Sequence, residues 1–285
     1  MKSALILFAY NRPTLLRSTI RSLKAALDEL RRLSPEAPAL SITVAIDGAR
    51  SSADRAPHDA LLVDEVATVA RTLLPSATIR QERVNRGLPA HLLSVMSEIP
   101  AGVERVICIE DDVEMSPTLL HALITTSDRM LENSGNAAHV IGAAPEHRDG
   151  SLEHQALLMT RSAHQASEAL LREYVDHFAL DGAQHEGGYG LRDHNAIYAW
   201  SAEIARSVGL RAPQGTSQDR MRELAWRQAG VTLHGLPMRL VKHRGLWGQH
   251  NTPWHALRTG QLFQRLDRRP WGAIEDDLRR SARQR

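Results

Sequence analysis

The chain has 285 residues, of which 42% are hydrophobic and 24% are charged, and these values exclude a disordered or collagen-like protein. One cysteine, Cys108, excludes a disulfide framework and a thiolate zinc cluster, and it favours a reducing compartment. The net charge of +2 is too small for a protein devoted to nucleic acid, so no nucleic-acid partner is expected. No apolar run approaches the ~20 residues of a membrane span, and the sequence predicts a cytoplasmic protein.

The first half of the chain alternates short apolar runs with longer amphipathic stretches. Unbroken apolar runs are typical of strands buried on both faces of a parallel sheet, and leucines at helical spacing indicate the helices between them. In chain order the sequence predicts a strand at 5–9, a helix from Pro13, a strand at 42–46, a helix at 58–74, a strand at 77–80, a helix from Gly87 to Met96, a strand at 103–109, a helix from Ser116-Pro117 and a strand at 140–142. This order implies right-handed crossovers and a parallel sheet with helices on both faces.

The regular alternation stops beyond residue 145. There the sequence predicts a helix at 164–174, a strand at 195–200, a short helix at 202–208 and a helix at 218–229. No internal repeat or low-complexity linker divides the chain. At roughly 100–200 residues per domain, one domain with an irregular second half fits best, with the change near Ala144.

Polar side chains follow four of the predicted strands, and ligands of α/β sheets bind at the carboxyl ends of strands. The sharpest signal is an acidic triplet, because three adjacent carboxylates repel one another unless a cation or hydrogen-bond donors offset their charge. Oxygen ligands at a strand end suit Mg²⁺ or Mn²⁺ shared with phosphates. The alternative is a solvated acidic turn that caps the following helix. The four groups are Asn11-Arg12, Asp47, Asn85-Arg86 and Glu110-Asp111-Asp112.

The other residues of these groups each have a structural alternative. Asp47 precedes a glycine and could be a turn aspartate. Arg12 and Arg86 could be solvated, although each lies on the edge where a pyrophosphate would sit. The amino end of the helix after Gly87 would also favour an anion. His91, one turn into that helix, could instead be a partly buried histidine with a satisfied ring.

These groups and their flanks resemble the nucleotide-sugar half of GT-A fold glycosyltransferases. The similarity is closest to the N-acetylglucosaminyltransferase I family, which has a Glu-Asp-Asp form of the DxD metal motif. The likeness covers roughly residues 3–145, with a patch near 217–249, and it implies an α/β GT-A (Rossmann-like) fold with a mostly parallel central sheet. Residues 1–145 would bind the nucleotide sugar, and residues 146–285 would bind the acceptor and carry the catalytic base. The segments that carry the resemblance are Leu7–Pro13, Ile46–Gly48, Ala90-His91, Ile109–Glu114 and Ser116-Pro117.

The resemblance implies a role for each residue on the donor side. Arg12 matches an arginine that approaches the nucleotide and its phosphates. Asp47 matches an aspartate that hydrogen-bonds the uracil, and His91 matches a histidine that contacts the base. Arg86, on the same edge, is expected to bind the donor as well.

Within the acidic triplet, the resemblance implies that Asp112 binds Mn²⁺ directly. Asp111 and Glu110 would contact the ribose and support the site. We expect Asp112→Asn to remove most metal-dependent binding. The same change is expected to leave the melting temperature nearly unchanged, because a solvated carboxylate contributes little to the core.

Two later segments resemble the rest of that family's site. The run from Ser217 to Arg222 resembles a degraded Trp-Asp-Asp-Trp-Met-Arg motif, and Asp219 falls on the aspartate that acts as catalytic base. Alternatively, Asp219 is a helix-initiating carboxylate favoured by the helix dipole, and the two roles can coexist. Residues 242–250 resemble a glycine-bearing loop that closes over the donor diphosphate, with Arg244 as a donor ligand. His243 or His250 could replace the histidine of that loop.

The sequence therefore predicts a glycosyltransferase that uses Mn²⁺ or Mg²⁺ and a nucleotide-diphosphate sugar as its donor. The expected donor is a UDP-sugar, and UDP-GlcNAc is one candidate. It would transfer the sugar with inversion to the hydroxyl of a glycan, lipid-linked or small-molecule acceptor. The alternatives are a retaining transferase, a sugar nucleotidyltransferase and a non-catalytic binding protein on the same fold. A nucleotidyltransferase usually opens with a Gly-rich phosphate loop, and residues 9–13 contain no glycine.

The tail at 258–285 is basic, since eight arginines stand against four acidic residues and give a net charge of +4. Apolar residues between the arginines predict amphipathic helices broken at Pro270. We favour a tail that packs on the domain with its arginines in water. The alternative is weak peripheral contact with the inner face of an anionic membrane.

Overall fold

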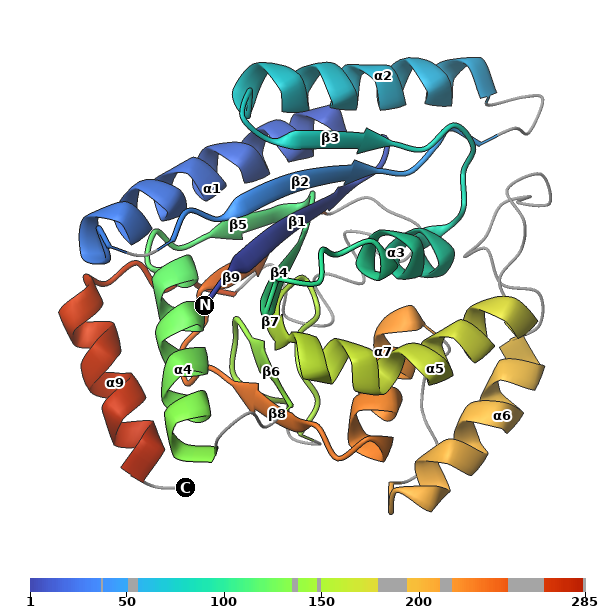
Figure 1. Ribbon diagram of the computed structural model, residues 1–285. Coiled ribbons are helices and arrows are strands. Elements are labelled where there is room, and N and C mark those ends of the chain that lie inside the picture. The colour runs from blue at the N-terminus through green and yellow to red at the C-terminus, as the bar shows by residue number, and fades with distance from the viewer. Residues whose placement is uncertain are drawn as a thin grey trace.

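The computed structural model describes residues 1–36, 38–50, 56–134, 138–147, 150–178, 194–210, 217–245 and 264–283. Its central sheet contains β1 (Ser3–Ala9), β2 (Ser41–Ile46), β3 (Thr78–Gln81), β4 (Arg105–Glu110), β6 (His139–Gly142), β7 (Ala156–Thr160) and β8 (Thr232–Gly235). These seven strands lie in the order β3-β2-β1-β4-β7-β6-β8 (Figure 1). Strand β7 runs antiparallel to β4 and β6, and the other pairs of this sheet are parallel.

Helices cover both faces of the sheet. One face is covered by α1 (Pro13–Leu33), α2 (Ala56–Leu73), α4 (Leu119–Ser134) and α9 (Trp271–Arg283), whose apolar residues share one core cluster. The other face is covered by α3 (Leu88–Ser97), α5 (Arg161–Phe178) and α7 (Gln218–Gln228), and α6 (His194–Ser207) packs against α5 and α7. None of the helices in the described ranges is both long and apolar enough to cross a bilayer.

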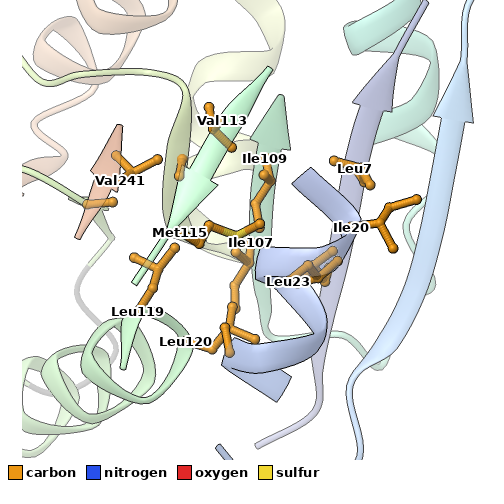
Figure 2. Close-up of a cluster of buried hydrophobic side chains, with 14 of the residues drawn as sticks. Leu7, Ile20, Leu23, Ile107, Ile109, Val113, Met115, Leu119, Leu120 and Val241 are labelled. Carbon is orange, nitrogen blue, oxygen red and sulfur yellow. The ribbon is translucent and has the colours of Figure 1, made fainter. Parts of the chain in front are cut away.

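Strand β1 shows why the central strands are continuously apolar. Leu5 and Leu7 point into the core under α1 and α2, whereas Ile6 and Phe8 belong to the core on the opposite face. Alternate residues of a strand point to opposite faces, so a strand covered on both sides must be apolar throughout. Figure 2 shows the first of these cores, where side chains from β1, α1, β4, α4 and two short strands meet.

Helix α1 follows β1 directly and begins as the sequence predicts. Pro13 occupies its first turn, where the missing backbone N–H is not needed. Leu16, Ile20 and Leu23 recur at helical spacing and are completely buried. The helix therefore lies along the sheet with its first turn at the carboxyl end of β1.

The predicted architecture, an α/β protein with a mostly parallel central sheet and helices on both faces, is confirmed. Both expected halves of the chain supply strands to this one sheet, since β7 lies between β4 and β6, and β8 pairs with β6 at the edge. The strands expected at 5–9, 42–46, 77–80, 103–109 and 140–142 are present with bounds shifted by a few residues.

One predicted element is wrong. We expected a strand at 195–200 and a short helix after it, but α6 runs through both segments. Ile197 and Ile204 are seven residues apart and are buried in the same cluster as residues of α5 and α7. Seven residues make about two helical turns, so this packing requires a helix and overrides the β propensity of the local sequence.

A small second sheet was not expected. Strand β5 (Val113–Met115) pairs antiparallel with β9 (Val241–His243), and Val113 lies opposite His243. Strand β7 was not expected either, although all five of its residues are buried. Both features bring residues from the second half of the chain to the end of β4.

Helix α9 packs on the domain, which confirms the favoured interpretation for the described part of the tail. Ile274 is completely buried and Leu278 nearly so. The ring of Trp271 meets the ring of His121 edge to face, with 4.2 Å between their centroids. Arg129 of α4 pairs with Glu275 at 3.1 Å. Residues 258–263 lie outside the described ranges.

Replacing Ile274 with alanine is expected to lower the free energy of unfolding by about 2–4 kcal/mol, because it removes buried methylene groups and leaves a cavity. Denaturant unfolding followed by circular dichroism measures this change. Arg279→Ala is the matched control in the same helix, since its exposed i,i+4 pair with Glu275 contributes less than about 0.5 kcal/mol. An unchanged unfolding midpoint for the Ile274 variant would contradict the packed position of α9.

Candidate functional site

The carboxyl ends of β1, β2 and β4 lie at one edge of the sheet. The three strands are parallel, with Ala9 opposite Ile46 and Phe8 opposite Glu110. The residues that follow them, Arg12, Asp47 and the acidic triplet, therefore emerge at the same edge, as the sequence predicts.

Asp112 is the centre of this edge. Its side chain is only 3% exposed. Oδ2 accepts a hydrogen bond from Nη1 of Arg12 at 2.5 Å and lies 3.0 Å from Nε2 of His243. Arg12 also pairs with Asp111. The other carboxylate oxygen, Oδ1 of Asp112, is buried and has no hydrogen-bond partner among the described residues.

This burial corrects one expectation. Asp112 was expected to be a solvated carboxylate whose replacement would leave the melting temperature nearly unchanged. It is instead buried between the cationic side chain of Arg12 and the ring of His243. A buried carboxylate with such partners contributes to stability, so its replacement has a structural cost as well.

The three carboxyl groups of the triplet differ in acidity. Burial raises the pKa of Glu110 well above its ordinary value, and the charges of Asp112 and Asp219 raise it further. Burial raises the pKa of Asp111 to about 6, although Arg12 opposes that shift. Burial alone would also raise the pKa of Asp112, but the contacts with His243 and Arg12 lower it. Asp112 is thus the carboxylate that stays ionised most readily.

The residues around Asp112 fit a divalent cation. A carboxylate oxygen and an imidazole nitrogen meet there, and Mn²⁺ accepts both kinds of ligand. Gly245 leaves room beside them, because a Cβ atom at this position would lie 2.5 Å from Oδ2 of Asp112. The described ranges contain no group of three His, Cys, Asp or Glu side chains around one point.

The backbone around the triplet is held by α1 and β9. The hydroxyl of Thr19 lies 2.7 Å from the carbonyl of Asp111 and 2.8 Å from that of Val113, and it accepts a hydrogen bond from the nitrogen of Val113. The backbone nitrogen of Arg244 donates to the carbonyl of Asp112 at 2.6 Å. Sequence reasoning missed Thr19, because a threonine inside an amphipathic helix carries no signal of this role.

Arg244 does not point its guanidinium at Asp112. Its Nη1 donates to Glu114 at 2.9 Å, and the same carboxylate pairs with Arg268 ahead of α9. It is the backbone of Arg244, directly after His243, that contacts Asp112. His250, the other histidine named for this loop, lies outside the described ranges.

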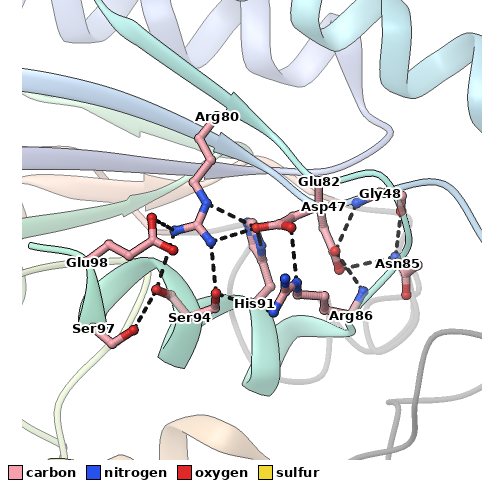
Figure 3. A network of polar contacts seen from close by, with 10 residues as sticks. All are labelled: Asp47, Gly48, Arg80, Glu82, Asn85, Arg86, His91, Ser94, Ser97 and Glu98. Carbon is pink, nitrogen blue, oxygen red and sulfur yellow. Dashed lines mark hydrogen bonds and ion pairs between the residues drawn. The ribbon is translucent and has the colours of Figure 1, made fainter.

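Asp47 directly follows the last residue of β2, and its carboxylate binds the segment that precedes α3 (Figure 3). Oδ1 accepts hydrogen bonds from the backbone nitrogens of Gly48 and Arg86, each at 2.9 Å, and Oδ2 accepts one from Asn85 at 3.1 Å. Burial raises the pKa of Asp47, although the neighbouring His91 opposes the shift. The turn role is therefore present, and contact with a nucleotide base stays a prediction.

His91 and Arg86 lie beside this turn. The ring of His91 is buried against Phe8, with 6.0 Å between ring centroids, and its Nδ1 lies 4.0 Å from Oε1 of Glu82. Burial lowers the pKa of His91, which favours the neutral ring. Arg86 donates to Glu82 at 3.0 Å and is half-exposed. Arg86 is therefore the more accessible of the two.

Asp219 lies in the first turn of α7. Ser217 caps the helix by accepting a hydrogen bond from the nitrogen of Arg220, so Asp219 is not the cap itself. Its side chain is 37% exposed, and its charge raises the pKa of both Glu110 and Tyr174. Oδ1 of Asp219 lies 3.6 Å from Nδ1 of His154, and the carbonyl of the next residue, Gln155, accepts a hydrogen bond from the backbone nitrogen of Glu110, so Asp219 lies near the triplet. Both roles considered for Asp219 stay predictions.

A further carboxylate, Asp59, was missed. It is buried at the start of α2 and accepts hydrogen bonds from the hydroxyl of Tyr10, from Asn11 at 2.6 Å and from the nitrogen of Arg50 at 2.7 Å. Burial, together with Asp59, raises the pKa of Tyr10. The loop after β1, which carries Arg12, is therefore tied to α2.

No family model and no curated protein matches the sequence. Solved structures with similarity to the chain include S. aureus TarS, at 13% identity and a TM-score of 0.36 over 60% of this chain. The chain spans 31% of that TarS chain. A 4-diphosphocytidyl-2C-methyl-D-erythritol synthase from Anaerococcus prevotii matches at 11% identity and a TM-score of 0.39, over 82% of this chain and 88% of its own. The galactosyltransferase LgtC, in complex with donor and acceptor sugar analogs, matches at 14% identity and a TM-score of 0.42, over 95% of this chain and 99% of its own. These values are too low to transfer an activity.

Proposed function

We propose that the chain is a cytoplasmic, metal-dependent glycosyltransferase that takes a sugar from a nucleotide-diphosphate donor. The observation that carries the proposal is Oδ1 of Asp112, which is buried and finds no hydrogen-bond partner among the described residues, while Oδ2 of the same carboxylate lies 3.0 Å from His243 at the carboxyl edge of a mostly parallel sheet. A buried carboxylate oxygen without a donor is a costly arrangement, and a bound cation would satisfy it.

Asp112 and His243 would hold Mn²⁺ or Mg²⁺, with donor phosphate oxygens and water completing its coordination. Arg12 lies against both Asp111 and Asp112 and would face the diphosphate, and Arg244 would join it from the end of β9. Such a cation supplies Lewis-acid stabilisation of the leaving diphosphate. The presence of Gly245 supports this arrangement, since a larger residue would fill the space.

The nucleotide would lie toward β2 and α3, past the ribose-side carboxylates Glu110 and Asp111. Asp47, Arg86 and His91 are grouped there, and Arg86 offers an exposed guanidinium. We propose a UDP-linked donor, including UDP-GlcNAc, on the resemblance of these residues to a uracil-binding set.

Cleavage of the sugar–phosphate bond builds negative charge on the β-phosphate oxygen. Arg12 and Arg244 would stabilise that charge as it develops. The acceptor hydroxyl of a glycan, lipid-linked or small-molecule acceptor is a weak nucleophile until a base takes its proton. Asp219 would accept that proton from the face opposite the leaving diphosphate, which gives inversion at the anomeric carbon.

UDP is expected to bind at least about tenfold more tightly with Mn²⁺ than with a chelator, a difference of about 1.4 kcal/mol, because a cation held by Asp112 would offset the charge of the diphosphate. Isothermal titration calorimetry measures this, and UDP release from a panel of UDP-sugars then identifies the donor. Equal affinity in chelator would contradict the metal site.

The products separate the remaining candidates. Release of pyrophosphate from a sugar phosphate and a nucleoside triphosphate would indicate a sugar nucleotidyltransferase. Binding of UDP-sugars without turnover would indicate a non-catalytic binding protein. A product with the anomeric configuration of the donor would indicate a retaining transferase.

A further inference from the structure

A histidine outside the acidic triplet lies against Asp219. The segment before β7 runs beside the triplet, since the backbone nitrogen of Glu110 donates to the carbonyl of Gln155 at 3.0 Å. The side chain of the preceding residue, His154, is 7% exposed and lies between two carboxylates of α7. Its Nδ1 is 3.6 Å from Oδ1 of Asp219, and its Nε2 is 3.7 Å from Oε2 of Glu223.

The surroundings of His154 hold its ring in one orientation. The ring stacks on the buried indole of Trp226, with 5.5 Å between centroids and 5° between planes. Glu223 is buried and accepts a hydrogen bond from Arg227 at 2.9 Å. Burial alone would raise the pKa of Glu223, but the contacts with His154 and Arg227 lower it. Glu223 is therefore an ionised anchor on one side of the ring.

The other side of the ring is incomplete. Nδ1 of His154 is buried and has no hydrogen-bond partner within the ranges that the structure describes. Its distance of 3.6 Å from Asp219 is longer than a hydrogen bond. Oδ1 of Asp219 also accepts a hydrogen bond from the side-chain amide of Gln218. Because the stacked ring is confined and the side chain of Asp219 is partly exposed, a small movement of that carboxylate would close the remaining gap to Nδ1.

We propose that His154 is the positioning residue for the catalytic base, with Nδ1–H holding the carboxylate of Asp219 toward the acceptor hydroxyl. In this arrangement Nδ1 faces Asp219 on one side of the ring and Nε2 faces Glu223 on the other. This inference rests on the proposed function, since Asp219 is a base only there. In this chain of contacts the buried carboxylate of Glu223 orients the ring of His154, and the ring in turn orients the carboxylate of Asp219.

Two substitutions separate the hydrogen bond from the packing. His154→Phe keeps an aromatic ring on Trp226 and removes both nitrogens. His154→Asn loses the stacking but places an amide N–H near the position of Nδ1. His121→Phe is the matched control, because His121 also packs against a tryptophan, Trp271, and lies in α4.

We expect His154→Phe to lower kcat for UDP release by about 10- to 100-fold, the loss typical of a misplaced catalytic group, with the Kd for UDP and Mn²⁺ unchanged. His154→Asn should recover most of the lost kcat although it loses the stack. His121→Phe should leave kcat unchanged. In an Asp219→Asn background, His154→Phe should cause no further loss, because the two residues act through one contact.

The outcomes are distinct. Full kcat in His154→Phe, or a His154→Asn variant as slow as the Phe variant, would overturn the role of Nδ1. Full turnover in Asp219→Asn would instead overturn the proposed base. If no UDP-sugar is turned over, ¹⁵N NMR of the His154 ring still decides, since Asp219→Asn should shift the Nδ1 resonance. An unchanged resonance would overturn the contact.

Discussion

Replacing Asp219 with asparagine is expected to lower the turnover by about 10²–10⁴-fold while the affinity for the donor stays the same. An amide cannot accept the proton of the acceptor hydroxyl, so the attack loses its base. Donor affinity should be retained, because Arg12 and Asp112, which we propose for the diphosphate and the cation, pair with each other and not with Asp219. Steady-state UDP release and calorimetric titration of UDP with Mn²⁺ measure the two quantities.

The control for Asp219→Asn comes from the same helix turn. Ser217→Ala removes the cap of α7 and is expected to cost about 1 kcal/mol of stability while the carboxylate remains. Its turnover should therefore stay close to that of the wild type. If the two variants lost turnover equally, the effect of Asp219 would be that of a helix-initiating carboxylate and not of a base.

Replacing Asp112 with asparagine is expected to abolish the effect of Mn²⁺ on UDP affinity. The change removes the charge of the carboxylate that carries the proposed cation site and leaves a neutral amide beside His243. Calorimetric titrations with Mn²⁺ and with chelator should then give the same Kd. Glu114→Gln is the control from the neighbouring strand, since Glu114 pairs with Arg244 and Arg268 and not with Asp112, and it should retain the Mn²⁺ effect.

The same Asp112 variant should also lose about 1–3 kcal/mol of unfolding free energy in chelator, because a buried, charge-assisted hydrogen bond to Arg12 is weakened. Chemical denaturation without metal measures this loss. A variant with unchanged stability would mean that the pair of Arg12 with Asp111 alone holds the loop in place.

The sequence predicts the central sheet well for a physical reason. Strands covered on both faces are apolar over most of their length, so β1 and β4 are visible as apolar runs, and β2 as a run of β-forming residues that includes Thr43. The residues directly after these strands then share one edge of the sheet. Arg12, Asp47 and Asp112 can therefore be grouped at one edge from the sequence alone, and the register of the three parallel strands agrees with this grouping.

The parts that could not be predicted depend on contacts between distant segments. His243 meets Asp112 only because two strands of three residues, β5 and β9, pair across more than a hundred residues of sequence. Such short strands carry no periodicity of their own. His154 likewise depends on the antiparallel entry of β7 beside β4, and Ile197 lies in a helix because of its neighbours in α5 and α7.

Helix α1 contacts both sides of the proposed cation site. Arg12 stands at its amino end, and Thr19, two turns further on, binds the backbone on both sides of Asp112. A displacement of α1 would therefore move the guanidinium and the acidic loop together, and their relative alignment would survive small motions of the fold. The hydrogen bonds of Thr19 couple the acidic loop to α1, and the apolar residues of the same helix anchor it in the core. The geometry of the site is therefore supported by the packing of α1.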